Sequence, residues 1–435
     1  MAGGDVDRFT LAVVTAEAEA SDGRLVRGRG ASMLSVPWAW PRSPLGWRER
    51  DRALRELTDS LCDQAGRTMP GDPLAIFDEL EAHLDAQAGL DARDDRSDAR
   101  DGRMDARAGR DEPEGRLDTR DGRRNARDGR SNGRDGRSNG RDGRSNGRDG
   151  RSNGRDGSSD MPRLAAALAL GAVDNAVHDA WARAAGKPAA DLYPGLLGVP
   201  AWGAPRTRLP VQHVVGVGDP LDEVRAWLAR DGIRHVKVKA AGRDPEEDAA
   251  RVTAVHALLG GAEGATISVD LNEGYASPAD AVAMVDALSA EVLAGVTYLE
   301  QPVPRDAPAD PDGMRELTRR LPVLADESLA ATADLERLAA DGWSGVVVKA
   351  ARGQSLALRS WRFARERGLA AMVQDLTAVD LGLAHSARLA ATLPWSWPAF
   401  ECNSRQYAPG ANAGLDFMNV VDGHLTLATP GPGLA

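Results

Sequence analysis

The sequence predicts an α/β protein: a barrel of eight parallel strands alternating with helices, preceded by a smaller α+β domain that carries a polar insert. From residue 209 onward, short β-branched apolar runs alternate with amphipathic helical stretches. Five successive runs between residues 235 and 349 also end on charged side chains. In a parallel barrel the carboxyl ends of the strands meet at one mouth, so these charges should face one another there.

The smaller domain should begin with a β-hairpin over residues 9–20 and 24–36, because two alternating runs flank a Ser-Asp-Gly turn. Leucines at helical spacing predict helices over 48–65 and 72–87, and an alanine-rich stretch predicts another over 162–186. We therefore divide the chain into 1–90 and 161–208 for this domain, 91–160 for the insert, 209–408 for the barrel and 409–435 for a returning segment.

The insert decays into repeats of RDGRSNG between Arg127 and Gly154. Its seven-residue period has no apolar position, which excludes a coiled coil and leaves a calcium-binding β-roll without a core. We expect a disordered, solvated linker of Arg, Asp, Gly, Ser and Asn. Its basic charge leaves open a contact with a polyanion.

Eight runs can be placed as barrel strands, and a helical stretch fills the gap after each of them except the last. They cover residues 211–217, 235–239, 266–270, 296–300, 323–327, 345–349, 370–374 and 399–403. A doubly wound open sheet is the alternative. It is disfavoured because no glycine-rich phosphate loop follows the first run.

Composition narrows the class of partner. The formal net charge of −11 at pH 7 argues against a general nucleic-acid or membrane binder and favours a small polar substrate. Cys62 and Cys402 are too few for a disulfide framework, so we expect both to be reduced. The amino terminus lacks a signal-peptide pattern and no long apolar run occurs, which predicts a soluble, cytoplasmic protein.

Five motifs, taken together, resemble the enolase superfamily, and within it the muconate-lactonizing-enzyme-like branch of the mandelate racemase/muconate lactonizing enzyme family. They are VKVK, SVDLN, YLEQP, LADES and VVVK, in this order and spacing, and the resemblance runs from residue 163 to the end. It implies a modified TIM barrel, (β/α)7β, under a capping domain formed by the α+β part.

The resemblance implies that Asp270, Glu300 and Asp326 bind one Mg²⁺ per subunit, and that Lys239 and Lys349 are bases on opposite faces of the substrate. Hard oxygen donors without nearby His or Cys independently favour Mg²⁺. Removal of a proton α to a carboxylate forms an ene-diolate, which needs a metal beside a positioned amine. The alternative is a purely structural role, in which these charged side chains form ion pairs at exposed strand ends.

Further positions are candidates for substrate binding. Lys237 points to the same strand face as Lys239, so it should hold the substrate carboxylate, or else pair with Glu327. Glu401 and Arg405 on the last strand should contact the substrate, or else pair with each other.

The capping domain and the strand ends supply the remaining candidates. Trp38, Trp40 and Trp47 lie in a proline-rich loop that suggests an apolar lid, with Trp38 and Trp40 as substrate contacts and domain packing as the alternative. Asn272 and Glu327 should support the metal ligands. Gln301 and Ser328 are rim candidates without an assigned role.

These observations predict a Mg²⁺-dependent racemase or epimerase that acts on a small carboxylate and forms a homo-oligomer. A cycloisomerase or β-elimination lyase, of the muconate cycloisomerase or o-succinylbenzoate synthase type, shares the first half of this chemistry and remains open. A non-catalytic scaffold with a polyanion-binding insert is the alternative from another class.

Overall fold

The computed structural model describes residues 9–68, 71–101, 160–397 and 399–434. One compact unit comprises Met1–Ala88 and Gly157–Ala435, and so holds both the hairpin domain and the large sheet. The predicted insert falls almost wholly in a second unit, Gly89–Asp156, of which residues 102–156 lie outside the described part. None of the helices in the described part combines the length and apolar character of a membrane span.

The predicted hairpin is confirmed as β1 (Thr10–Glu19) and β2 (Leu25–Leu34), which pair antiparallel along their whole length. A short helical turn and three long helices follow. They are α1 (Val36–Ala39), α2 (Trp47–Ala65), α3 (Pro73–Asp101) and α4 (Arg163–Ala184). Helix α3 continues beyond residue 91, where the sequence pattern had placed the start of the insert.

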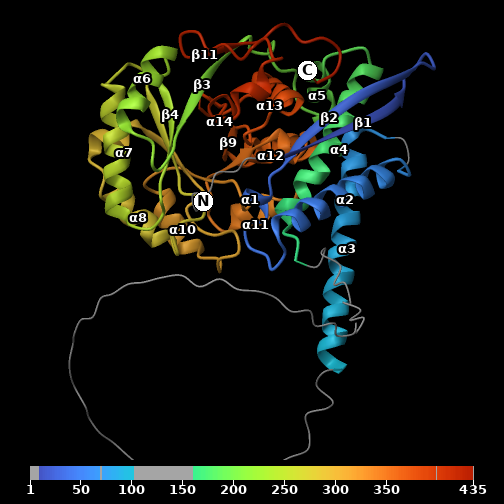
Figure 1. The fold of residues 1–435 in the computed structure, drawn as a ribbon, viewed down its shortest axis with the longest axis horizontal. Helices are drawn as coiled ribbons and strands as arrows, with labels where there is room; N and C mark the ends of the chain where they lie inside the picture. Colours follow the sequence, from blue (N-terminus) through green and yellow to red (C-terminus); the bar gives the residue numbers. More distant parts are fainter. Residues whose placement is uncertain (1–8, 69–70, 102–159, 398, 435) are drawn as a thin grey trace, which may run out of the picture. The chain divides into compact units, whose positions relative to one another are not determined.

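Helix α4 lies against the hairpin at backbone contact distance (Figure 1). A Cβ atom added at Gly28 would lie 2.0 Å from the backbone nitrogen of Ala180, and one at Gly30 would lie 2.1 Å from that of Ala176. No larger residue fits at either position, and the facing helix is correspondingly rich in alanine. The sequence therefore packs these two elements without side chains between them.

The large sheet contains eight parallel strands in chain order, with the last strand beside the first. The strands are β3 (Arg208–Val215), β4 (His235–Lys239), β5 (Thr266–Asp270), β6 (Val296–Glu300), β7 (Val323–Ala325), β8 (Gly345–Val348), β9 (Ala370–Val373) and β10 (Phe400–Glu401). Strand β11 (His424–Thr426) pairs antiparallel with β3. One isolated parallel bridge, between Gln374 and Glu401, joins the two ends of this path.

Helices follow the strands and lie along the outer side of the sheet, as α6, α7 and α8 show in Figure 1. The helices after α4 are α5 (Ala189–Leu197), α6 (Leu221–Asp231), α7 (Pro245–Leu259), α8 (Pro278–Asp286), α9 (Ala290–Gly295), α10 (Pro311–Thr318), α11 (Asp334–Ala340), α12 (Gln354–Arg367), α13 (Asp380–Thr392) and α14 (Ser404–Tyr407). A 3₁₀ turn, η1 (Ala350–Arg352), links β8 to α12.

Alternation along the strands sorts their side chains between two cores. Tyr298, Leu324, Val347 and Met372, from four successive strands, form a buried cluster of their own. The alternate residues of the same strands pack into the larger core beneath the helices. Because side chains alternate along a strand, Lys237 and Lys239 both lie on the face opposite Val236 and Val238.

Candidate active site

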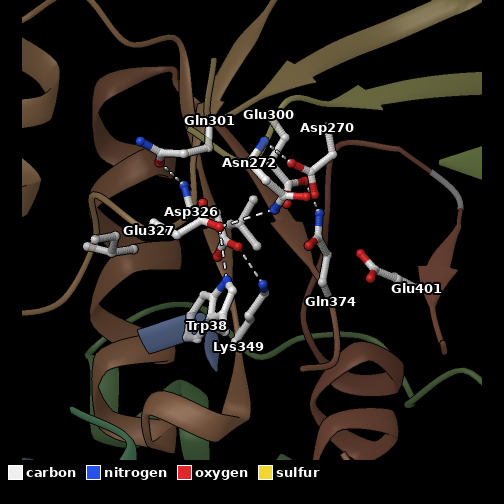
Figure 2. A network of polar contacts seen from close by, with 12 residues as sticks. Trp38, Asp270, Asn272, Glu300, Gln301, Asp326, Glu327, Lys349, Gln374 and Glu401 are labelled. Carbon is white, nitrogen blue, oxygen red and sulfur yellow. Dashed lines mark hydrogen bonds and ion pairs between the residues drawn. The ribbon is translucent and has the colours of Figure 1, made fainter. Parts of the chain in front are cut away.

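The charged strand ends are brought together at one end of the parallel sheet (Figure 2). Lys239 is in register with Asp270, and Asp270 with Glu300, so three successive strands present one charged group each at the same level. Asp326 follows β7 and Lys349 follows β8, which extends the row to five strands. All five side chains are buried except that of Lys239, which is 22% exposed.

Each carboxylate of the row is paired with a lysine amine. Lys239 Nζ donates to Asp270 Oδ2, and Lys349 Nζ donates to Asp326 Oδ2 at 2.5 Å. Glu300 Oε2 accepts from Lys237 Nζ at 2.8 Å. Buried ion pairs of this kind persist only when each charge is compensated, so the lysines and carboxylates form one interdependent network.

The backbone turns sharply where the strands end. Asn272, Glu273 and Gln301 have φ angles of 43°, 65° and 40°, a region that residues other than glycine seldom adopt. The turns allow local hydrogen bonds: the backbone N–H of Asn272 donates to Asp270 Oδ1 at 2.9 Å. Gln301 Oε1 accepts from the backbone N–H of Asp326 at 2.9 Å and so fixes the next carboxylate. Such strained positions cluster at functional sites when the surroundings hold them.

Glu327 connects the row to the smaller domain. Its Oε1 accepts from Trp38 Nε1 at 2.9 Å and from Asn272 Nδ2 at 3.2 Å, and the ring of Trp38 covers Lys349 Nζ at 4.9 Å from its centre (Figure 2). Asn272 Oδ1 in turn accepts from Lys239 Nζ at 2.9 Å. Trp38, Asn272 and Glu327 therefore all lie at the site.

Trp40 is placed differently from its neighbour. It is fully buried in a cluster with Leu34, Leu54 and Leu168, which belong to the smaller domain. Its indole packs this domain, and the structure does not bring it to the strand ends. Trp47 packs against the same cluster, so only one of the three tryptophans expected in a lid, Trp38, faces the charged row.

Glu401 and Arg405, the two substrate-binding candidates at the last strand, have different partners in the structure. Glu401 accepts from Lys237 Nζ and, through Oε1, from Asn403 Nδ2 at 2.9 Å, so it belongs to the network. Arg405 pairs instead with Asp231 at 2.5 Å and with His213 Nδ1 at 3.0 Å, on the side of α6. Neither the pairing of Glu401 with Arg405 nor that of Lys237 with Glu327 occurs among the described contacts.

Burial and the neighbouring charges set the protonation of the network. Burial raises the pKa of Glu300 to about 8, against the opposing pull of the Lys237 amine. Burial and the adjacent Asp326 charge raise the pKa of Glu327 to about 7. Burial alone would lower the pKa of Lys239, but the Asp270 carboxylate outweighs it and raises that pKa. Burial would raise the pKa of Asp270, but the Lys239 and Lys237 amines outweigh it and lower that pKa. The site thus holds Lys239 as an ammonium ion paired with an ionised carboxylate, while Glu300 and Glu327 titrate closer to neutral pH.

Three residues at the site were not predicted from the sequence. Gln374 Nε2 donates to Glu300 Oε2 at 2.6 Å. The buried guanidinium of Arg352 donates to the backbone oxygens of Asp326, at 2.6 Å, and of Leu329 and Val347. Arg305 pairs with Glu273 at 2.7 Å and donates to the backbone oxygen of Trp38 at 3.3 Å. A polar residue directly after a buried apolar run was the available signal for Gln374.

As arranged, the carboxylates face the lysine amines, and no group of three or more His, Cys, Asp or Glu side chains in the described residues could hold a metal ion. The donor chemistry nevertheless fits Mg²⁺. Glu300 Oε1, Asp326 Oδ1 and Glu327 Oε2 are buried and accept no hydrogen bond from the described residues. Buried, unsatisfied carboxylate oxygens are costly and are the hard donors that Mg²⁺ prefers.

Known proteins are similar to part of this chain. Residues 219–435 match a family model described as Enolase C-terminal domain-like. An aromatic dipeptide epimerase from Herpetosiphon aurantiacus is 34% identical over 197 residues, which are 44% of this chain and 53% of that protein. A chloromuconate cycloisomerase from a Pseudomonas species is 31% identical over 175 residues, 39% of this chain and 43% of that protein. The matched segments thus span about half the length of these relatives.

A solved structure extends the likeness to the whole fold. A mandelate racemase/muconate lactonizing enzyme homologue from Roseovarius nubinhibens, complexed with magnesium, superposes with a TM-score of 0.60. The match covers 99% of this chain and 91% of that one at 20% sequence identity. At this identity the likeness supports a shared fold, and function has to be argued from the site.

Proposed function

Because this chain belongs to the mandelate racemase/muconate lactonizing enzyme branch of the enolase superfamily, we propose that it is a Mg²⁺-dependent racemase or epimerase. It would act at the carbon α to a carboxylate. The observation that carries this proposal is the row of buried carboxylates at Asp270, Glu300 and Asp326, flanked by the amines of Lys239 and Lys349. Few other reactions need two amines at opposite ends of one group of hard anionic donors.

The proposal includes a closed (β/α)7β barrel with the smaller domain as its cap. The bridge between Gln374 and Glu401 supports closure, as does the hydrogen bond from the backbone N–H of Asp375 to the backbone oxygen of Glu401 at 3.2 Å. Closure would place Lys239 and Lys349 across one mouth from each other.

In the proposed reaction, the neutral amine of one lysine takes the α proton and becomes an ammonium ion. The ammonium ion of the other lysine then returns a proton to the opposite face of the same carbon and becomes neutral. No proton or electron is gained or lost overall, and the configuration at carbon is inverted. Lys237, held by Glu300 and Glu401, would bind the substrate carboxylate.

Asp270, Glu300 and Asp326 would hold the Mg²⁺ ion. When bound, it would neutralise the charge that develops on the substrate carboxylate as the proton leaves. Trp38 would exclude water from Lys349, because its ring already covers that amine.

The free thiols of Cys62 and Cys402 agree with the cytoplasmic location that we propose.

A cycloisomerase is the second candidate, favoured by the similarity to chloromuconate cycloisomerase. Proton NMR in D₂O with Mg²⁺ separates the two, using N-acylamino acids, dipeptides and small acyl carboxylates as substrates. Loss of the α-proton signal with inversion supports a racemase or epimerase, ring formation supports a cycloisomerase, and loss of water supports the β-elimination lyase that the sequence also left open. Absence of exchange with every carboxylate would contradict both.

A further inference from the structure

The smaller domain hydrogen-bonds to the turn that follows Lys349, which Arg352 also anchors to the sheet. Ser32 Oγ, on β2, donates to the backbone oxygen of Ala351 at 2.8 Å. Asn175 Nδ2, on α4, donates at 3.0 Å both to the backbone oxygen of Ala350 and to that of Ala31. One buried amide therefore ties the hairpin, α4 and the turn together.

Backbone contact reinforces these hydrogen bonds. A Cβ atom added at Gly171, on α4, would lie 2.2 Å from the backbone oxygen of Ala351 and 2.8 Å from the backbone nitrogen of Gly353. The turn thus lies directly on the helix with no side chain between them. Ser32 and Asn175 are 1% and 0% exposed, so their hydrogen bonds cannot be replaced by water without opening the contact.

The amine of Lys349 is covered from the same side. The Trp38 ring centre lies 4.9 Å from Nζ, a distance at which a cation is attracted to the face of an indole. The Lys349 side chain is 6% exposed. The smaller domain therefore contacts both the turn and the charged end of this lysine.

The turn after Lys239 is held by different means. The backbone N–H groups of Ala241 and Gly242 donate to the two oxygens of Asp248, at 2.7 and 2.9 Å. Asp248 lies on α7, beside the parallel sheet. The Lys239 amine bonds to Asp270 and Asn272, which also belong to the sheet and the turn after it.

We propose that Asn175 and Ser32 are positioning residues for Lys349 alone, and that Asp248 is the positioning residue for Lys239. The smaller domain would then position the lysine of one proton transfer, Lys349, and the sheet with α7 would position the lysine of the other, Lys239. This inference rests on the proposed two-lysine reaction. It predicts that a change in the contact with the smaller domain impairs exchange from one enantiomer and spares the other.

The first arm of the test measures α-proton exchange in D₂O with Mg²⁺, using L-Ala-L-Phe and L-Ala-D-Phe as separate probes. The Lys349→Ala variant identifies the epimer whose α-proton exchange depends on Lys349. Asn175→Ala and the milder Ser32→Ala should slow α-proton exchange of that same epimer. We expect a loss of about 10- to 100-fold, the size of effect that a misplaced catalytic group produces. Exchange of the other epimer should change by less than about twofold, well below that misplacement effect.

Two variants serve as matched controls. Asp248→Asn should slow α-proton exchange of the epimer whose exchange depends on Lys239. Tyr193→Phe removes another contact from the smaller domain, the 3.3 Å hydrogen bond to Gln354 Oε1, and should change neither epimer. Equal losses for both epimers in Asn175→Ala and Ser32→Ala, or no loss in either, would overturn the inference.

The second arm of the test measures the accessibility of the two lysine amines and does not depend on catalysis. Limited reductive methylation followed by mass spectrometry gives the modification rate of each lysine in the full-length protein. Asn175→Ala should raise the rate at Lys349 relative to Lys239, and Asp248→Asn should do the reverse. If the wild type exchanges neither dipeptide, the proposed function fails for these probes and the methylation rates decide the inference. Equal changes at both lysines, or none, would then overturn it.

Discussion

The indole nitrogen of Trp38 donates a hydrogen bond to Glu327 Oε1 at 2.9 Å, joining helix α1 of the smaller domain to a carboxylate just after β7. The same indole covers the Lys349 amine. These two contacts can be separated by substitution. Trp38→Phe keeps an aromatic ring over the amine and removes the hydrogen bond, whereas Trp38→Ala removes both.

We expect Trp38→Phe to lower kcat/KM by roughly fivefold, the cost of about 1 kcal/mol for one hydrogen bond. Trp38→Ala should lower it by roughly 100-fold, because water then reaches Lys349. Steady-state kinetics with matched thermal unfolding curves separates activity from stability. Equal losses in the two variants would show that covering the amine has no role.

Arg305 should position helix α1, which carries Trp38. Its guanidinium forms two hydrogen bonds to Glu273 and reaches the backbone oxygens of Trp38 and Ala39. Arg305→Lys cannot reproduce this forked geometry, so we expect KM to rise about tenfold with little change in fold. Arg42→Ala, which removes an exposed pair with Asp306, is the control and should alter stability by less than about 1 kcal/mol. An unchanged KM in Arg305→Lys would contradict this role.

Removal of a proposed metal ligand should be visible in Mg²⁺ binding itself. Asp326→Asn should weaken Mg²⁺ binding, measured by isothermal titration calorimetry. The loss should exceed the roughly 10- to 100-fold that is typical when a residue that only hydrogen-bonds to a metal ligand is replaced. Chelation with EDTA should abolish activity, and added Mg²⁺ should restore it. Asp306→Asn, at an exposed site, should bind Mg²⁺ like the wild type. Full activity in EDTA would exclude the metal from the account.

Stability should depend on pH through His385. Burial lowers the pKa of His385 to about 4, and neither ring nitrogen has a hydrogen-bond partner among the described residues. Because this pKa lies below the ordinary value of about 6.5, the neutral ring favours the folded state above pH 6.5 and that advantage is lost as pH falls. Between pH 6.5 and 5 the wild type should lose about 2 kcal/mol that His385→Leu retains.

Urea unfolding of the two proteins at several pH values measures this difference. The variant should be at least as stable as the wild type at pH 7.5, since it leaves no ring nitrogen unsatisfied. Parallel pH profiles for the two proteins would contradict the assignment.

The strand ends could be predicted because their signal is local. A buried parallel strand is a continuous apolar run, so the first charged residue after it marks the mouth, as at Asp270, Glu300 and Lys349. The hairpin and long helices follow from similar local periodicity. The insert, the oligomeric state and the location remain predictions, the first because most of it, residues 102–159, lies outside the described residues.

The remaining contacts could not be predicted because they join distant parts of the chain. Asn175 and Ala350 are 175 positions apart, and Trp38 and Glu327 are 289 apart. Nothing near Trp40 indicates that it packs a core while Trp38 faces the site. Arg405 likewise lies beside Glu401 in sequence, yet its partner Asp231 comes from α6.

The most direct test of the two-lysine account is α-proton exchange with both configurations of one substrate, in wild type, Lys239→Ala, Lys349→Ala and the double variant. The account predicts that the wild type exchanges and interconverts both configurations. Each single variant should exchange only one configuration without inversion, and the double variant should exchange neither. Inversion at the wild-type rate in a single variant, or exchange that survives in the double variant, would contradict it.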